Sequence, residues 1–208
     1  MYKHPLLDRD KMTTKEALDI LKEGNQRFIN NLRENKDYPS LLGITKNQQH
    51  PFASILSCSD SRAPVELIFD QAIGDIFSVR LAGNIASNDA IGSLEFGIKY
   101  LKSKLLVVMG HTSCGAVKAC CDHFEDGSIT EVISKITPCL DLEDITKDDR
   151  NSGNVDFVQN VSNLNVKQQI KEILNSSKII AECHEKKDIL IIGAMYNIET
   201  GEVNFFES

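Results

Sequence analysis

Two short segments carry the residues whose types and spacing point to chemistry. Cys58 begins the segment Cys-Ser-Asp-Ser-Arg that ends at Arg62, and His111 begins the segment His-Thr-Ser-Cys-Gly that contains Cys114. Thiolates and imidazoles are ligands that zinc prefers, and three protein ligands leave the fourth tetrahedral position to water. The pattern therefore predicts a catalytic zinc ion, one per chain, rather than a closed structural site.

Asp60 and Arg62 lie directly after the first ligand, two positions apart. The guanidinium group of arginine can hold a carboxylate through two hydrogen bonds and keep it ionised. We expect Asp60 either to orient the water that zinc activates or to move onto zinc as a fourth ligand in a closed state. The competing interpretation is a surface ion pair worth about 0–1 kcal/mol. Taken singly, Cys58, His111 and Cys114 would more often be buried thiols and a core histidine than ligands.

Both ligand segments follow apolar runs that predict buried strands. The strand predictions are residues 52–58, 75–80, 104–111, 188–196 and 202–206. Helical segments separate the first four, which favours an α/β fold with a mainly parallel central sheet and helices on both faces, and the last run is expected as an antiparallel edge strand. We expect strand order 2-1-3-4, which would make the strands that end at Cys58 and His111 neighbours. Ligands bind such sheets beyond the carboxyl ends of the strands, where strand order reverses. This order would place Cys58 and His111 over one crevice.

The rest of the chain reads as helices of a single domain. A capping box that begins at Thr13 opens a helical arm of about residues 13–35, which we interpret as packing, against the same chain or a second subunit. Helical periodicity recurs over residues 88–101, 129–142 and 155–185, the last with a break near residues 175–177. No repeat or low-complexity linker divides the chain, so we predict one domain over residues 1–208.

The composition disfavours several classes of partner. Thirty acidic residues against 23 basic ones give a formal net charge of −7, which argues against nucleic acid. No apolar run approaches the roughly 18 residues of a membrane helix, and residues 1–10 lack the apolar segment of a secretory signal. Six cysteines in such a chain predict reduced thiols or metal ligands rather than disulfides. We expect a cytoplasmic protein.

The two ligand segments and several further motifs resemble the β-class carbonic anhydrases. The further motifs are Asp70-Gln-Ala-Ile-Gly-Asp75, Val79-Arg-Leu-Ala-Gly-Asn84, Gly92-Ser-Leu-Glu-Phe96 and the closing Gly193-Ala-Met-Tyr196. The resemblance implies a β-carbonic-anhydrase-like domain that catalyses the reversible hydration of CO₂ to bicarbonate and a proton. It also implies a homodimer or an assembly of dimers whose subunits share active-site walls.

The resemblance assigns roles residue by residue. It implies that zinc binds Cys58, His111 and Cys114, that Asp60 with Arg62 forms the catalytic dyad, and that Gln71 and Gly115 contact substrate. In one respect the chain departs from the family: some members use a tryptophan in an inhibitory bicarbonate pocket, and this chain has no tryptophan. We do not expect that regulation here.

Two alternative functions stay open at this point. The same scaffold could hydrolyse CS₂ or COS by the same attack on a linear molecule, and access to the pocket would decide between these substrates and CO₂. The chain could instead be a zinc-stabilised binding protein without turnover. The presence of both Asp60 and Arg62 disfavours this second alternative, because a closed structural site needs neither.

Overall fold

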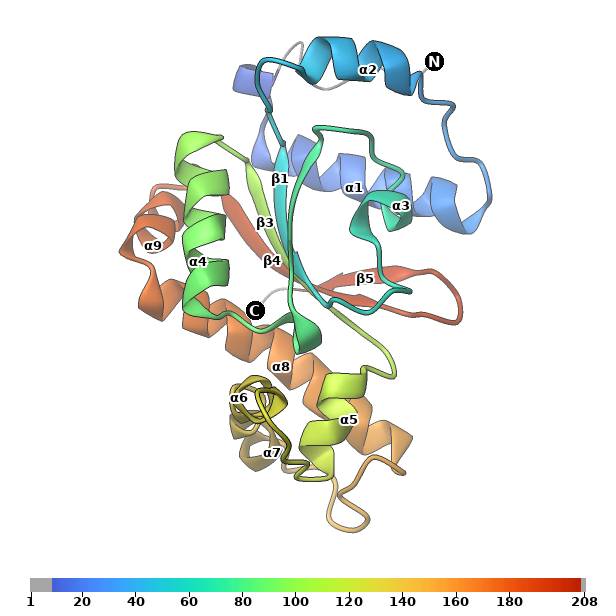
Figure 1. Ribbon diagram of the computed structural model, residues 1–208, viewed down its shortest axis with the longest axis vertical. Helices are drawn as coiled ribbons and strands as arrows, with labels where there is room; N and C mark the ends of the chain where they lie inside the picture. Colours follow the sequence, from blue (N-terminus) through green and yellow to red (C-terminus); the bar gives the residue numbers. More distant parts are fainter. Residues whose placement is uncertain (1–8, 207–208) are drawn as a thin grey trace.

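The computed structural model describes residues 9–206, so the domain limits predicted at residues 1 and 208, and nearly all of the N-terminal segment 1–10, lie outside the described residues. Five strands form one sheet in the order β2-β1-β3-β4-β5, in which only the β4–β5 pair is antiparallel. The strands are β1 (Ala53–Ser57), β2 (Ile76–Arg80), β3 (Leu105–His111), β4 (Leu190–Tyr196) and β5 (Val203–Phe206). The predicted fold class, strand order and antiparallel edge are confirmed (Figure 1).

The parallel pairing of β1 with β3 fixes where the ligand segments leave the sheet. Ser57, the last residue of β1, lies opposite Met109 of β3, two residues before His111. Both strands are buried along their whole length, as their continuous apolar sequences require. Cys58 and His111 therefore lie side by side at the carboxyl ends of two neighbouring strands, at the point where the order of strands reverses.

Helices cover both faces of the sheet (Figure 1). Helices α1 (Thr14–Ile29) and α3 (Val65–Ile68) pack on one face, in a core that includes Leu21 and Phe69. Helices α4 (Asn88–Glu95), α8 (Val155–Ser176) and α9 (Lys178–Glu185) cover the other. Among the described residues, no helix combines the length and hydropathy needed to cross a bilayer.

A third apolar cluster lies beyond the carboxyl ends of the strands. It is built by α5 (Gly115–Cys121), α6 (Ile129–Ser134), α7 (Pro138–Leu142) and the first half of α8. Cys58 and Cys114 both belong to this cluster. The candidate ligands thus lie in an apolar layer of their own, between the sheet and these helices.

Several helices differ from the predicted ones for local reasons. The capping box at Thr13 is present, but α1 ends at Ile29, and a separate helix α2 (Tyr38–Thr45) follows. The predicted helix over 129–142 is two short helices, because Pro138 begins α7 and cannot donate a backbone hydrogen bond to the preceding turn.

The remaining short helices are η2 (Arg9–Lys11), η3 (Ala82–Asn84) and the π-helical η4 (Phe96–Tyr100), which continues α4. The predicted break in the long C-terminal helix lies at Ser177.

The link between α1 and α2 is tied to the body of the protein by a buried carboxylate. Asp70 accepts hydrogen bonds from Arg27 Nε at 2.6 Å and from the backbone N–H of Glu34 at 3.1 Å, and it pairs with the Lys36 ammonium group. Burial raises the pKa of Asp70, but the two cations and the N–H group outweigh burial, and the pKa is lowered overall. Asp70 is therefore ionised at neutral pH and joins Arg27 of α1 to two residues of the link, Glu34 and Lys36.

We expect Asp70→Asn to lower the free energy of unfolding at pH 7 by about 1–3 kcal/mol, because two cations lose their charged partner. A lowered folded-state pKa stabilises the protein above the unfolded value of about 3.9, and this contribution is lost as pH falls through the folded-state pKa. Urea unfolding at about pH 7 and about pH 3 should therefore show a larger difference between the two proteins at the higher pH.

Asp37→Asn is the matched control, because Asp37 caps α2 through its side chain and asparagine caps equally well. An Asp70→Asn protein as stable as the wild type at pH 7 would show that the ion pairs contribute nothing.

Candidate metal centre

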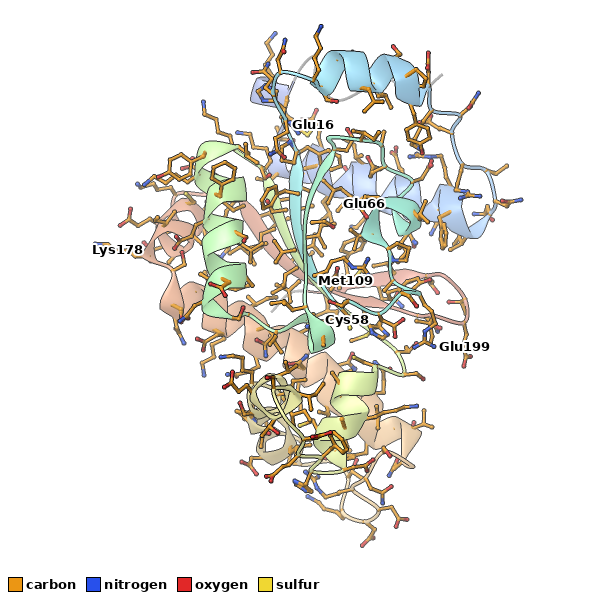
Figure 2. The ribbon with its side chains drawn as sticks, in the orientation of Figure 1. Glu16, Cys58, Glu66, Met109, Lys178 and Glu199 are labelled. Carbon is orange, nitrogen blue, oxygen red and sulfur yellow. The ribbon has the colours of Figure 1, made fainter. Side chains whose placement is uncertain are left out.

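Three side chains from three different elements meet at the carboxyl edge of the sheet. Cys58 follows the last residue of β1, His111 is the last residue of β3, and Cys114 is the N-cap of α5. Figure 2 marks Cys58 at this end of the sheet. The ligand atoms of the three residues lie within 4.8 Å of one another, and all three residues are buried. This is the trio that the sequence pattern singled out.

The distances and the unsatisfied atoms fit a metal ion. The two sulfur atoms are 3.9 Å apart, whereas zinc–sulfur bonds of about 2.3 Å at a tetrahedral angle would place them about 3.8 Å apart. His111 Nδ1 lies 2.9 Å from the carbonyl oxygen of Thr112, to which an N–H group at that position donates. His111 Nε2 is buried and has no hydrogen-bond partner among the described residues. A buried imidazole nitrogen whose opposite nitrogen is held by a carbonyl is the usual arrangement of a metal-bound histidine.

The surroundings of Cys58 favour a thiolate. The pKa of Cys58 is lowered to about 4, chiefly because the Cys114 thiol donates to its sulfur. The backbone N–H groups of Asp60 and Gly83 donate to the same sulfur at 3.4 and 3.3 Å. The pKa of Cys114 is raised by the same contact and by burial. One proton is thus shared between two sulfur atoms, and a divalent cation would displace it because metals bind thiolates.

Asp60 and Arg62 form a doubly hydrogen-bonded ion pair beside the trio. Arg62 Nε donates to Asp60 Oδ1 at 3.0 Å and Nη2 donates to Oδ2 at 2.7 Å. The pKa of Asp60 lies well below its usual range, chiefly because of the Arg62 side chain. Asp60 Oδ2 is 3.7 Å from His111 Nε2. In this structure Arg62 therefore holds an ionised carboxylate at the rim of the ligand cluster.

Sequence reasoning gave no role to Arg80, which organises the first ligand segment. Arg80 is the last residue of β2. Its guanidinium group donates to the carbonyl oxygens of Cys58 at 3.0 Å and of Asp60 at 2.6 Å. One signal could have found it: the predicted order places β2 beside β1, so an arginine that ends β2 lies at the edge where Cys58 emerges.

The two predicted substrate residues lie in different places. Gly115 follows Cys114 as the first residue of α5, and a Cβ atom there would meet no other atom within 4 Å. Gln71 instead donates its amide to the carbonyl oxygen of Phe69 at 2.6 Å and packs against Gly24 of α1. The contacts of Gln71 within one chain are thus with α1 and the end of α3, not with the three ligands.

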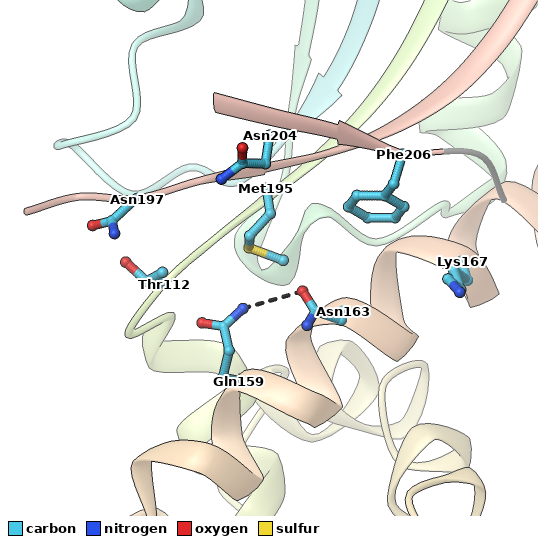
Figure 3. Close-up of a pocket in the computed structure, with 8 residues that line it drawn as sticks. All are labelled: Thr112, Gln159, Asn163, Lys167, Met195, Asn197, Asn204 and Phe206. Carbon is cyan, nitrogen blue, oxygen red and sulfur yellow. Dashed lines mark hydrogen bonds between the residues drawn. The ribbon is translucent and has the colours of Figure 1, made fainter. Parts of the chain in front are cut away.

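A cavity of about 580 Å³ lies next to the centre but does not contain it. Thr112 lines it, together with side chains from α8, β4 and β5 that include Gln159, Asn163 and Met195 (Figure 3). Gln159 Nε2 donates to Asn163 Oδ1 at 3.1 Å across one wall. The three ligands, Asp60 and Arg62 do not line this cavity, so it is distinct from the place where the dyad faces the ligands.

Comparison with known proteins agrees with this geometry. The model of the carbonic anhydrase family matches residues 53–203. A carbonic anhydrase of Mycolicibacterium smegmatis is 32% identical over 194 residues, which cover 90% of this chain and 90% of that protein. The chain therefore belongs to the carbonic anhydrase family, which uses zinc, and its trio of ligands forms a cluster able to bind a metal ion.

Solved structures show the same fold. A β-carbonic anhydrase of the fungal pathogen Aspergillus fumigatus aligns with a TM-score of 0.71 at 24% identity, covering 92% of this chain and 89% of that one. One of the tetrameric β-carbonic anhydrases of Sordaria macrospora aligns with a TM-score of 0.69 at 24% identity, covering 83% and 86%. The fold is that of the β-class enzymes.

We expect Cys58→Ser to lose most of the zinc that the wild-type chain retains, because a serine hydroxyl group is a far weaker zinc ligand than a thiolate. Zinc per chain, measured by elemental analysis after dialysis against a weak chelator, should fall from about one to near zero. Cys183→Ser is the control, because Cys183 is a free cysteine outside the trio and only partly buried. Equal zinc content in the two variants would contradict the assignment.

Proposed function

We propose that this protein catalyses the reversible hydration of CO₂ to bicarbonate and a proton, with one zinc ion per chain held by Cys58, His111 and Cys114. The observation that carries the proposal is the Asp60–Arg62 pair, whose carboxylate lies 3.7 Å from the unpartnered nitrogen of His111. A purely structural zinc site has no use for an ionised carboxylate held at that place. Membership in the carbonic anhydrase family supports the same reaction.

Each side chain has a task in this reaction. Cys58, His111 and Cys114 would hold the zinc ion, which would lower the pKa of water and so supply a nucleophile for the reaction. Asp60 accepts a hydrogen bond from the attacking oxygen and fixes its orientation, and Arg62 keeps Asp60 ionised and in place. Gly115 leaves the space beside Cys114 open for substrate. The apolar cluster that contains both cysteines, with Ile85 and Ala116 among its members, suits an uncharged molecule such as CO₂.

We propose further that the working form is a homodimer or an assembly of dimers. Large apolar side chains are exposed on and near α2 and α3, among them Leu42, Ile44 and Leu67, which is typical of a surface that is covered in an assembly. The similar Sordaria macrospora enzymes are tetrameric. Because Gln71 lies near this surface and away from its own trio, we propose that it contacts substrate in the site of a second subunit.

A cytoplasmic location is also part of the proposal. All six cysteines are free, and five of them are buried. Reduced thiols in this number are typical of proteins that work in a reducing compartment.

Stopped-flow CO₂ hydration between about pH 6.5 and about pH 9 tests the proposed reaction, on protein whose zinc content is measured in the same sample. We expect fast turnover that rises with pH. Since Arg62 keeps Asp60 ionised over the whole range, the rise must come from another group, as expected for the water ligand of the metal. A fully zinc-loaded protein without CO₂ hydration would overturn the proposal, and CS₂ and COS hydrolysis would be measured next.

Asp60→Asn tests the role of the dyad. Asparagine keeps the size of the side chain but loses its charge, so we expect kcat to fall by about 10²–10³-fold while zinc content stays unchanged. Asp141→Asn, a change at an exposed position of α7, should leave both quantities unaltered. Normal turnover in Asp60→Asn would remove Asp60 from the mechanism.

A further inference from the structure

A chain of buried hydrogen bonds connects α8 to the sulfur atom of Cys58. The backbone N–H group of Gly83 donates to Cys58 Sγ at 3.3 Å. On the other side of the same residue, the carbonyl oxygen of Gly83 accepts from Asn165 Nδ2 at 2.9 Å. Asn165 Oδ1 in turn accepts from Gln169 Nε2 at 2.9 Å, one helical turn further along α8. The sulfur is thus three hydrogen bonds away from Gln169.

The side-chain amides of Asn165 and Gln169 bind the two ends of a loop that runs from Gly83 to Ala86, which we call the Gly83 loop. Gln169 Oε1 accepts from the backbone N–H of Ala86 at 2.8 Å, three residues after Gly83. Asn165 and Gln169 are almost completely buried, with exposed fractions of 0% and 2%. Buried side-chain amides cost free energy unless they are hydrogen-bonded. Two hydrogen bonds of this pair reach the loop, one joins the two amides, and Gln169 Nε2 also donates to the carbonyl oxygen of Lys135 at 3.3 Å.

The loop cannot easily take another path to the sulfur. Gly83 has a φ of +67°, and a Cβ atom at this position would lie 2.6 Å from Ile136 Cδ1. Gly83 is therefore confined at its α-carbon by packing and at its carbonyl group by Asn165. Its N–H group belongs to the preceding peptide group, so these two constraints limit the direction of that N–H group through the backbone angles of Gly83.

We propose that Asn165 and Gln169 are positioning residues for the metal centre, which act by fixing the Gly83 N–H group on the sulfur of Cys58. A correctly aimed N–H donor stabilises the negative charge that Cys58 Sγ carries when it is buried and binds a cation, so a displaced donor weakens metal binding. The pair has no contact of its own with the trio or with Asp60 among the hydrogen bonds of the described residues. The inference rests on the proposed zinc site, because it assigns the pair a role only toward a metal that Cys58 binds.

Asn165→Leu tests the inference, because leucine has a similar size but cannot make the hydrogen bonds of Asn165 to Gly83 and Gln169. We expect the dissociation constant for zinc, measured by competition with a chromophoric chelator, to rise about 10–100-fold. In the cobalt(II)-substituted protein, the sulfur-to-metal charge-transfer band should shift, which loss of stability alone would not cause. In kinetics we expect kcat to change more than KM, because the metal rather than substrate binding is altered.

Two controls lie on the same helix. Ser162→Ala removes a buried hydroxyl group that donates to Val158 within α8, and Asn163→Leu repeats the substitution at a half-buried position bonded to Gln159. Both should keep zinc affinity within about twofold of the wild type and leave the cobalt band unmoved, whatever they do to the melting temperature.

Gln169→Leu keeps the inference testable if Asn165→Leu does not fold. This substitution keeps the hydrogen bond from Asn165 Nδ2 to Gly83 but removes the partners of Asn165 Oδ1 and of the Ala86 N–H group. We therefore expect a smaller rise in the zinc dissociation constant than for Asn165→Leu. If the variants that fold bind zinc as tightly as the wild type and show an unmoved cobalt charge-transfer band, the inference is wrong. The proposed zinc site would not be affected by that result. A wild-type chain that binds no zinc would overturn the proposed function and this inference with it.

Discussion

Two thiols and one imidazole can share a metal ion here only because β1 and β3 are parallel neighbours. Parallel strands end at the same edge, so Cys58 and His111 emerge together, and the turn into α5 brings Cys114 back to them. The order of the strands reverses at this point, which is where ligands bind in sheets of this kind. Every other feature of the centre depends on this meeting of two strand ends.

A buried thiolate costs free energy unless hydrogen-bond donors surround it, and the Cys114 thiol is only one such donor to Cys58. The structure supplies further donors, which are backbone N–H groups from the ligand segment and from the Gly83 loop. Neighbouring elements hold both donors in place. Arg80 donates to the carbonyl oxygens of Cys58 and Asp60, and Asn165 donates to the carbonyl oxygen of Gly83. Besides the Cys114 thiol, the fold thus stabilises the anion through backbone groups whose positions are set from β2 and α8.

The centre combines a buried side with an exposed one. The trio lies in apolar surroundings, with at most 5% of each residue exposed, whereas 53% of the Arg62 side chain is exposed. Asp60 lies between them, with 16% of its side chain exposed, bonded to Arg62 and close to His111. Small molecules and protons can therefore reach the dyad from solvent, while the sulfur atoms remain in a medium where their charge binds a cation strongly.

The sequence by itself predicted the cluster of Cys58, His111 and Cys114 and the Asp60–Arg62 ion pair, because each leaves a local pattern: Cys58 and His111 end apolar runs, and Asp60 and Arg62 are two positions apart. It also predicted the parallel sheet from the alternation of strands and helices. It could not reveal the role of Arg80, Asn165 or Gln169, nor where Gln71 lies. Amides one turn apart on a helix look like surface residues until the helix packs, and backbone carbonyl groups leave no trace in residue type. Only the tertiary structure decided those partners, because hydrogen bonds between distant segments depend on how closely α8, β2 and the Gly83 loop approach one another.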